Sequence, residues 1–166
     1  GCQKLIIWDI NEDGLAKTKE EFASLGGEVF IFKVDISNLD SIKINSQRVR
    51  TEVGSVDILI NNAGIVVGKY FHEHTHEQIE KSMLINSNAP MHITLEFLTG
   101  MILKNSGAIC NIASSAGLIS NPKMSVYAAS KWAVIGWSDS VRIELKQMKS
   151  NVQITTIAPY FINTGM

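Results

Sequence analysis

The chain has 166 residues, of which 45% are hydrophobic and 19% charged, and its formal net charge at pH 7 is −1. The chain has no excess of basic over acidic residues, which a nucleic-acid binding module would need, and that class is therefore excluded. No apolar run reaches the roughly 18 residues of a membrane-spanning helix, and Cys2 and Cys110 lack the spacing of a zinc site or a disulfide scaffold. We therefore expect small molecules or proteins as partners and a reducing compartment.

Apolar strand-like segments alternate with helical patterns along the chain. Asn11 is expected to cap the first helix and Gly26-Gly27 to end it. Two longer patterns, at about 75–103 and 125–149, predict large helices. Strands are expected at residues 4–9, 28–34, 56–60, 108–112 and 152–158. This alternation predicts an α/β fold with a parallel sheet.

Small and polar residues follow two of these strands. The strand at 56–60 runs into Asn61-Asn62-Ala63-Gly64, where small residues would let a ligand approach the backbone. The strand at 108–112 runs into another small-residue loop, which contains Ser114. The Ser114 hydroxyl could face the helix at 125–149.

Tyr127 and Lys131 lie four residues apart in the pattern at 125–149. This spacing puts both side chains on one helix face, about 6 Å apart at Cβ. An ammonium beside a phenol favours the phenolate, so the pair could exchange a proton with an alcohol or ketone near neutral pH. The alternative for an isolated pair is a packed tyrosine and a solvated lysine.

Together these segments resemble the short-chain dehydrogenase/reductase family. The matching pieces keep the family's order and spacing: Asn61-Asn62-Ala63-Gly64, Asn86 in Asn86-Ser87-Asn88-Ala89, Ser114, Tyr127 with Lys131, and Pro159 with Thr164. Residues 5–11 and 159–166 look most like the branch of epidermal retinol dehydrogenases and type 11-like 17β-hydroxysteroid dehydrogenases. The resemblance implies a Rossmann-like, doubly wound parallel sheet in three layers, as one incomplete NAD(P)-binding domain over residues 1–166.

By the same resemblance, the chain opens on the family's second strand. We therefore expect the first strand, its glycine-rich phosphate loop and the first helix to be absent, together with the family's substrate-covering helix and last strand. A truncated, non-catalytic fragment that associates with full-length relatives is the alternative to an enzyme.

The resemblance also implies NAD as the cofactor. Asp9 would accept both ribose hydroxyls of NAD and repel the 2′-phosphate of NADP, and Asp35 would bind the adenine amino group. The alternatives are that Asp9 only ends a strand or caps a helix, and that Asp35 starts one. The implied cofactor-binding residues are Asp9, Asp35, Asn62, Ala63, Gly64, Tyr127, Lys131 and Thr164.

For catalysis, the resemblance implies a proton relay that accompanies hydride transfer. Tyr127 would pass the proton, Lys131 would support the phenol and hold the nicotinamide ribose, and Ser114 would bind the substrate oxygen. Asn86 would link Lys131 through a water to solvent. A surface helix amide is the alternative for Asn86, and an ST-turn is the alternative for Ser114.

The implied substrates are lipophilic alcohols, retinol or hydroxysteroids, with the apolar segments 65–67 and 118–119 expected near Ser114. The implied location is the endoplasmic reticulum membrane or the lipid droplet. Trp132 and Trp137 predict core packing or a homodimer through the two long helices. We expect no metal site at His72, His74 and His76, because zinc needs a fourth ligand or a water and the segment looks like a polar loop.

Overall fold

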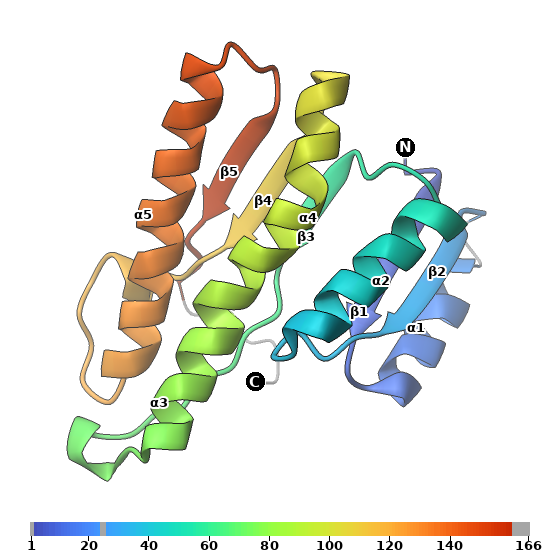
Figure 1. Cartoon of the computed structure of the whole chain (residues 1–166). Helices are drawn as coiled ribbons and strands as arrows, with labels where there is room; N and C mark the ends of the chain where they lie inside the picture. The colour runs from blue at the N-terminus through green and yellow to red at the C-terminus, as the bar shows by residue number, and fades with distance from the viewer. Residues whose placement is uncertain (1, 24–25, 161–166) are drawn as a thin grey trace. The chain divides into compact units, whose positions relative to one another are not determined.

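The computed structural model describes residues 2–23 and 26–160, which fall into two units, Gly1–Ser55 and Val56–Met166. Strands and helices alternate in both units, and every strand pair in the described residues is parallel (Figure 1). The predicted α/β class is therefore confirmed. Within these residues, no helix combines the length and the apolar character that crossing a membrane requires.

The first unit is a two-stranded sheet with a helix on each face (Figure 1). Its elements are β1 (Lys4–Asp9), α1 (Glu12–Ala23), β2 (Glu28–Lys33) and α2 (Leu39–Glu52). The strands pair from Lys4 with Glu28 to Asp9 with Lys33, so both end at the same edge. The buried apolar side chains of this unit come from α1, from β2 with the residue after it, and from α2: Leu15, Phe32, Val34, Ile42 and Val49.

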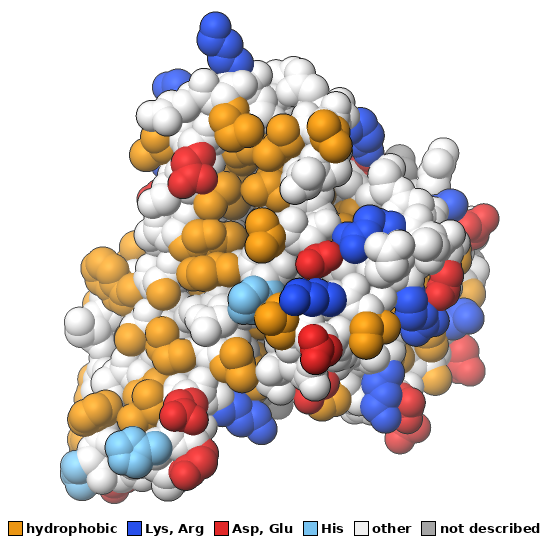
Figure 2. Space-filling view, viewed as in Figure 1, with side chains coloured by type: hydrophobic (Ala, Val, Ile, Leu, Met, Phe, Trp, Pro, Cys, Tyr) orange, Lys and Arg blue, Asp and Glu red, His pale blue; other side chains and the backbone are white. Residues whose placement is uncertain are grey.

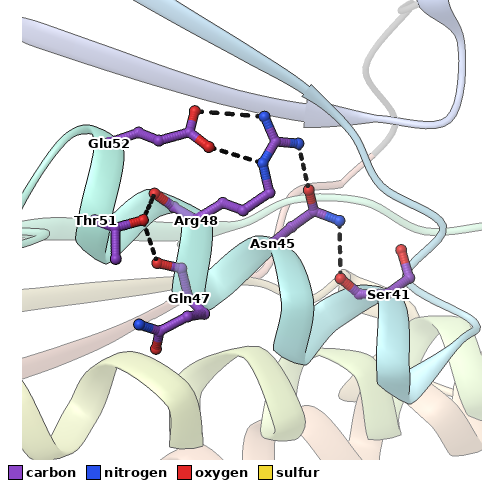
Figure 3. Close-up of polar contacts among 6 residues, drawn as sticks. All are labelled: Ser41, Asn45, Gln47, Arg48, Thr51 and Glu52. Atoms are coloured by element: carbon purple, nitrogen blue, oxygen red, sulfur yellow. Dashed lines mark hydrogen bonds and ion pairs between the residues drawn. The ribbon is translucent and has the colours of Figure 1, made fainter.

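Polar contacts run along α2 (Figure 3). Asn45 Nδ2 donates to the Ser41 carbonyl at 2.9 Å, and Arg48 Nε donates to Glu52 Oε1 at 2.8 Å. The same guanidinium lies 4.8 Å above the ring of Phe32. An exposed ion pair such as Arg48–Glu52 contributes only about 0.3–0.5 kcal/mol, so the buried apolar face holds α2 in place.

The second unit is a three-stranded sheet in the order β3-β4-β5. Its elements are β3 (Ile58–Asn61), the 3₁₀ turn η1 (Phe71–Glu73), α3 (His76–Met83), the π-helical turn η2 (Leu84–Asn88), α4 (Ala89–Lys104), β4 (Ala108–Ile112), the 3₁₀ turn η3 (Ser115–Gly117), α5 (Ser125–Gln147) and β5 (Gln153–Ile157). All five predicted strands are present, and their ends differ from the prediction by two residues at most.

Only one face of the second sheet is covered by α4 and α5 (Figure 1). Met101 from α4 and Leu145 from α5 join Ile109 and Ile154 in a buried cluster on this face. The intervening strand residues point the other way, and Ile58, Ile60 and Ile157 are 66%, 61% and 45% exposed. Parallel sheets are normally buried on both faces. Within the described residues, this second face is open.

The helical pattern at 75–103 is interrupted by a π turn, which the sequence analysis did not predict. The Ala89 N–H bonds to the carbonyl of Leu84, five residues back. Pro90 follows at the start of α4 and has no N–H to donate to the carbonyl of Asn86. The α-helical ladder therefore cannot run unbroken through Asn86, and π turns often mark functional positions.

Candidate active site

Tyr127 and Lys131 share one face of α5. The Lys131 Nζ lies 5.7 Å from the centre of the Tyr127 ring and donates to the carbonyl of Ile112, at the end of β4, at 2.8 Å. Lys131 is only 4% exposed, and burial lowers the pKa of its ammonium. A charge with so little solvent around it acts strongly on its neighbours, so this lysine is not the solvated one of the alternative interpretation.

Asn86 is buried at the centre of the π turn. Its Oδ1 accepts from the Ile65 N–H at 2.8 Å, and its Nδ2 donates to the Ile65 carbonyl at 2.9 Å and to Ser130 Oγ at 3.0 Å. The side chain is 1% exposed. The alternative of a surface helix amide is therefore wrong, because Asn86 ties the loop after β3 to α5.

Gly64 lies against both of these residues. A Cβ at Gly64 would stand 3.2 Å from Asn86 Oδ1 and 3.5 Å from Lys131 Nζ. Asn62 and Ala63, which precede it, are exposed. The absent side chain leaves backbone open beside a buried ammonium, which suits close approach by a ligand with hydroxyl or phosphate oxygens.

Ser114 is half-buried at the start of η3, and its Oγ accepts from the Ala116 N–H at 3.2 Å. This contact is the ST-turn that was its alternative. Gly117 ends η3, and a Cβ there would meet the Lys131 carbonyl oxygen at 2.9 Å and Ile135 Cδ1 at 2.8 Å. Only glycine lets the Ser114 loop lie this close to α5. Gly117 was not among the predicted site residues, although it lies in the small-residue loop that follows the strand at 108–112.

Asp9 and Asp35 belong to the first unit, at the carboxyl ends of neighbouring strands. The exposed Asp9 closes β1, and its Oδ1 accepts from the Asn11 N–H at 2.9 Å. Asp35 Oδ1 accepts from the N–H of Ser37 at 2.9 Å and from its hydroxyl at 2.6 Å. These are turn contacts of the kind expected in the alternatives. Ligands of open parallel sheets also bind at this edge.

All four predicted catalytic residues lie in the second unit. The contacts above bring Gly64, Asn86 and Lys131 together, with Tyr127 beside Lys131. Ser114 precedes the turn η3, whose Gly117 packs against α5. Thr164 lies outside the described residues. Ser130, which the sequence analysis did not single out, joins Asn86 to α5.

The three alternating histidines lie in and after η1. His72 stacks on Tyr70, His74 meets the edge of Phe71, and His76 opens α3. In the part of the chain that the structure describes, no group of three His, Cys, Asp or Glu side chains could hold a metal ion.

Helices that cross over between parallel strands, with polar groups at the carboxyl ends of those strands, define a Rossmann-like α/β protein. The chain belongs to the short chain dehydrogenase family, whose family model matches residues 1–166.

Two curated relatives agree with the branch that the sequence resembles. Estradiol 17-beta-dehydrogenase 11 of Homo sapiens is 38% identical over 163 residues, which cover 98% of this chain and 54% of the relative. Retinol dehydrogenase 10-B of Danio rerio is 33% identical over 183 residues, with 98% of this chain and 54% of the relative covered. The predicted family and branch are confirmed, and the chain spans about half the length of these relatives.

Solved structures agree with the fold. A short chain dehydrogenase/reductase from Burkholderia phymatum in complex with NAD matches with a TM-score of 0.92 and 29% identity, covering 96% of this chain and 57% of that one. A metagenomic short-chain oxidoreductase in complex with NADP matches with a TM-score of 0.89 and 28% identity, covering 96% and 72%. The Rossmann-like fold predicted from the sequence is confirmed.

Proposed function

We propose that the protein is an NAD-dependent oxidoreductase that converts lipophilic alcohols, retinol or hydroxysteroids, to the aldehyde or ketone. The buried ammonium of Lys131, 5.7 Å from the Tyr127 ring, carries this proposal. A phenol held beside a desolvated positive charge is suited to take a proton from an alcohol. The relationship to estradiol and retinol dehydrogenases supports the substrate class.

The residues present fit a dinucleotide. Gly64 leaves backbone open beside Lys131 Nζ, and Lys131 can donate to ribose hydroxyls. Bound NAD would supply the hydride acceptor. Tyr127 would take the hydroxyl proton, while Ser114 donates to the substrate oxygen as charge develops there. Asn86 would complete the relay through a water. Pro90 has no N–H, so the carbonyl of Asn86 lacks its α-helical donor.

Asp9 favours NAD over NADP in this proposal. Its carboxylate is exposed at the end of β1, where it can accept from ribose hydroxyls but repels a 2′-phosphate. Complexes with either cofactor occur among the solved relatives. The remaining cofactor contacts, at Asp35, Asn62, Ala63 and Thr164, are part of the same proposal. We also propose the endoplasmic reticulum membrane or the lipid droplet as the location, from the family resemblance.

To test the cofactor and the reaction, we would measure the 166-residue chain and a chimera in which it replaces the aligned region of human estradiol 17-beta-dehydrogenase 11. The chimera should form NADH from retinol and estradiol in preference to a short secondary alcohol. It should bind NAD at least about tenfold more tightly than NADP, because of like-charge repulsion at Asp9. Asp9→Ala should remove that preference, and Asp13→Ala, which removes an exposed acid from α1, should not.

Three results would count against this function. A chimera without activity toward any alcohol would refute it. A preference for the short alcohol would overturn the substrate class alone. Tighter binding of NADP would show that Asp9 is misassigned.

We also propose that the protein forms a homodimer through α4 and α5. Hydrophobic side chains gather over these two helices (Figure 2). Those most exposed are Leu95, Leu103, Trp132 and Ile143. Trp132→Glu should convert a dimer to a monomer in sedimentation velocity, whereas Phe22→Glu, on the exposed face of α1, should not. A wild-type chain that stays monomeric at high concentration would contradict the proposal.

A further inference from the structure

Ser130 lies on α5 between the two proposed proton-relay residues and is fully buried, with 0% exposure. Its Oγ donates to the Tyr127 carbonyl at 2.7 Å and accepts from Asn86 Nδ2 at 3.0 Å. Its own carbonyl accepts from the Ser87 hydroxyl at 3.1 Å. Ser130 therefore holds two consecutive residues of the π turn against the helix that carries Tyr127 and Lys131.

The direction of these bonds follows from the donors available. A serine hydroxyl has one hydrogen, and Ser130 gives it to the Tyr127 carbonyl. Toward Asn86 the oxygen can then only accept, so Asn86 must present its NH₂ group there. That leaves one N–H and the carbonyl oxygen of Asn86 for the backbone of Ile65, which is the arrangement observed.

We propose that Ser130 is a positioning residue of the active site. By fixing the Asn86 amide, it fixes the backbone at Gly64 and Ile65. A Cβ built on Gly64 would stand 3.5 Å from Lys131 Nζ, so this backbone lies beside the buried ammonium. Without the hydroxyl, an N–H of Asn86 would be buried with no acceptor, which is costly. The amide would turn toward another partner and release Ile65. The catalytic consequence rests on the proposed function.

Ser138 offers a matched control on the same helix. It is 1% exposed, its Oγ donates to the Val134 carbonyl at 2.6 Å, and it accepts from Asn111 Nδ2 at 2.8 Å. Ser138→Ala therefore removes the same two kinds of bond as Ser130→Ala. It leaves Asn86, Ile65 and Lys131 untouched.

The test compares hydrogen exchange of the Ile65 amide in the two variants of the 166-residue chain, each corrected for its change in global stability. Ser130→Ala should speed this exchange about tenfold, the scale of one lost hydrogen bond to a buried group. Ser138→Ala should leave the corrected rate unchanged. If Ser130→Ala does not fold, Ser130→Cys, which keeps the size and a weak acceptor, should show a smaller increase. Equal corrected rates in the serine variants and wild type would overturn the proposal.

In the active chimera, Ser130→Ala should lower kcat about tenfold and shift the pH profile of kcat, with little change in KM, because Asn86 and Lys131 lose their fixed geometry. Ser138→Ala should change neither the profile nor kcat. An unchanged kcat and profile in Ser130→Ala would refute the catalytic part of the proposal. If the chimera oxidises no alcohol at all, the proposed function fails, while Ile65 exchange still decides whether Ser130 positions this loop.

Discussion

Tyr127→Phe is expected to reduce alcohol oxidation by the chimera about 10²–10⁴-fold, the range of a lost general acid or base. The variant removes the group that exchanges the proton and leaves the ring in place. Within the described residues, the Tyr127 hydroxyl makes no hydrogen bond with another side chain or with backbone. Stability should therefore change by less than about 0.5 kcal/mol, and NAD binding should stay within about twofold of wild type because the ribose contact of Lys131 remains.

The matched control is Tyr70→Phe. Tyr70 is half exposed, and its ring stacks on His72 rather than beside Lys131. We expect it to keep nearly full activity. NADH formation measured with saturating NAD would separate the two tyrosines, and substantial activity surviving in Tyr127→Phe would rule out Tyr127 as the proton carrier.

Lys131→Met is expected to act in opposite directions on activity and on stability. Activity should fall about 10²–10³-fold, because the charge that supports the Tyr127 phenolate is lost, and NAD should bind more weakly. Burial lowers the pKa of Lys131 from its ordinary value of 10.5. Burying the charged form therefore costs folding free energy, and methionine removes that cost. The midpoint of thermal unfolding should rise by about 2–4 °C.

The pH dependence of the free energy of unfolding tests the stability prediction for Lys131→Met independently. Below the lowered pKa, wild-type Lys131 is protonated in both folded and unfolded chains, and the cost of burying its charge is fully present. As the pH rises from the lowered pKa toward 10.5, the unfolded chain binds more protons than the folded one, so this cost declines. The stability advantage of Lys131→Met should therefore shrink in that window.

Denaturant titrations across the alkaline range would measure that difference, with Lys146→Met on the exposed side of α5 as the control. If Lys131→Met unfolded at a lower temperature than wild type, the hydrogen bond to Ile112 would outweigh the cost of burying the charge.

The strands at 4–9 and 108–112 were predicted to the residue, because each is an apolar run that ends at polar or small residues. The end of β3 was not. Asn61 was assigned to a loop, yet it continues the strand, since its buried Nδ2 donates to Asn111 Oδ1 at 2.8 Å. A polar residue that finds its partner on a neighbouring strand cannot be told from a loop residue by its own sequence.

In the proposed site, too, local spacing was readable from the sequence and contacts between distant residues were not. The spacing of Tyr127 and Lys131 was readable because both lie on one helix. The contact of Ser130 with Asn86 joins residues 44 positions apart, and serine in a helix ordinarily bonds only to its own preceding turn. The π turn was also missed, because hydrophobic periodicity reports which face is buried and not which carbonyl each N–H reaches. Pro90 was the one local signal for it.

The open face of the second sheet governs how steeply denaturant would unfold the chain. The dependence of unfolding free energy on denaturant concentration scales with the surface newly exposed. Ile58, Ile60 and Ile157 already meet solvent in the folded state, as far as the described residues go, so they add little to that surface. The slope measured for this chain should therefore be shallower than its length implies, and it would report mainly the loss of the helix-covered face around Met101 and Ile109.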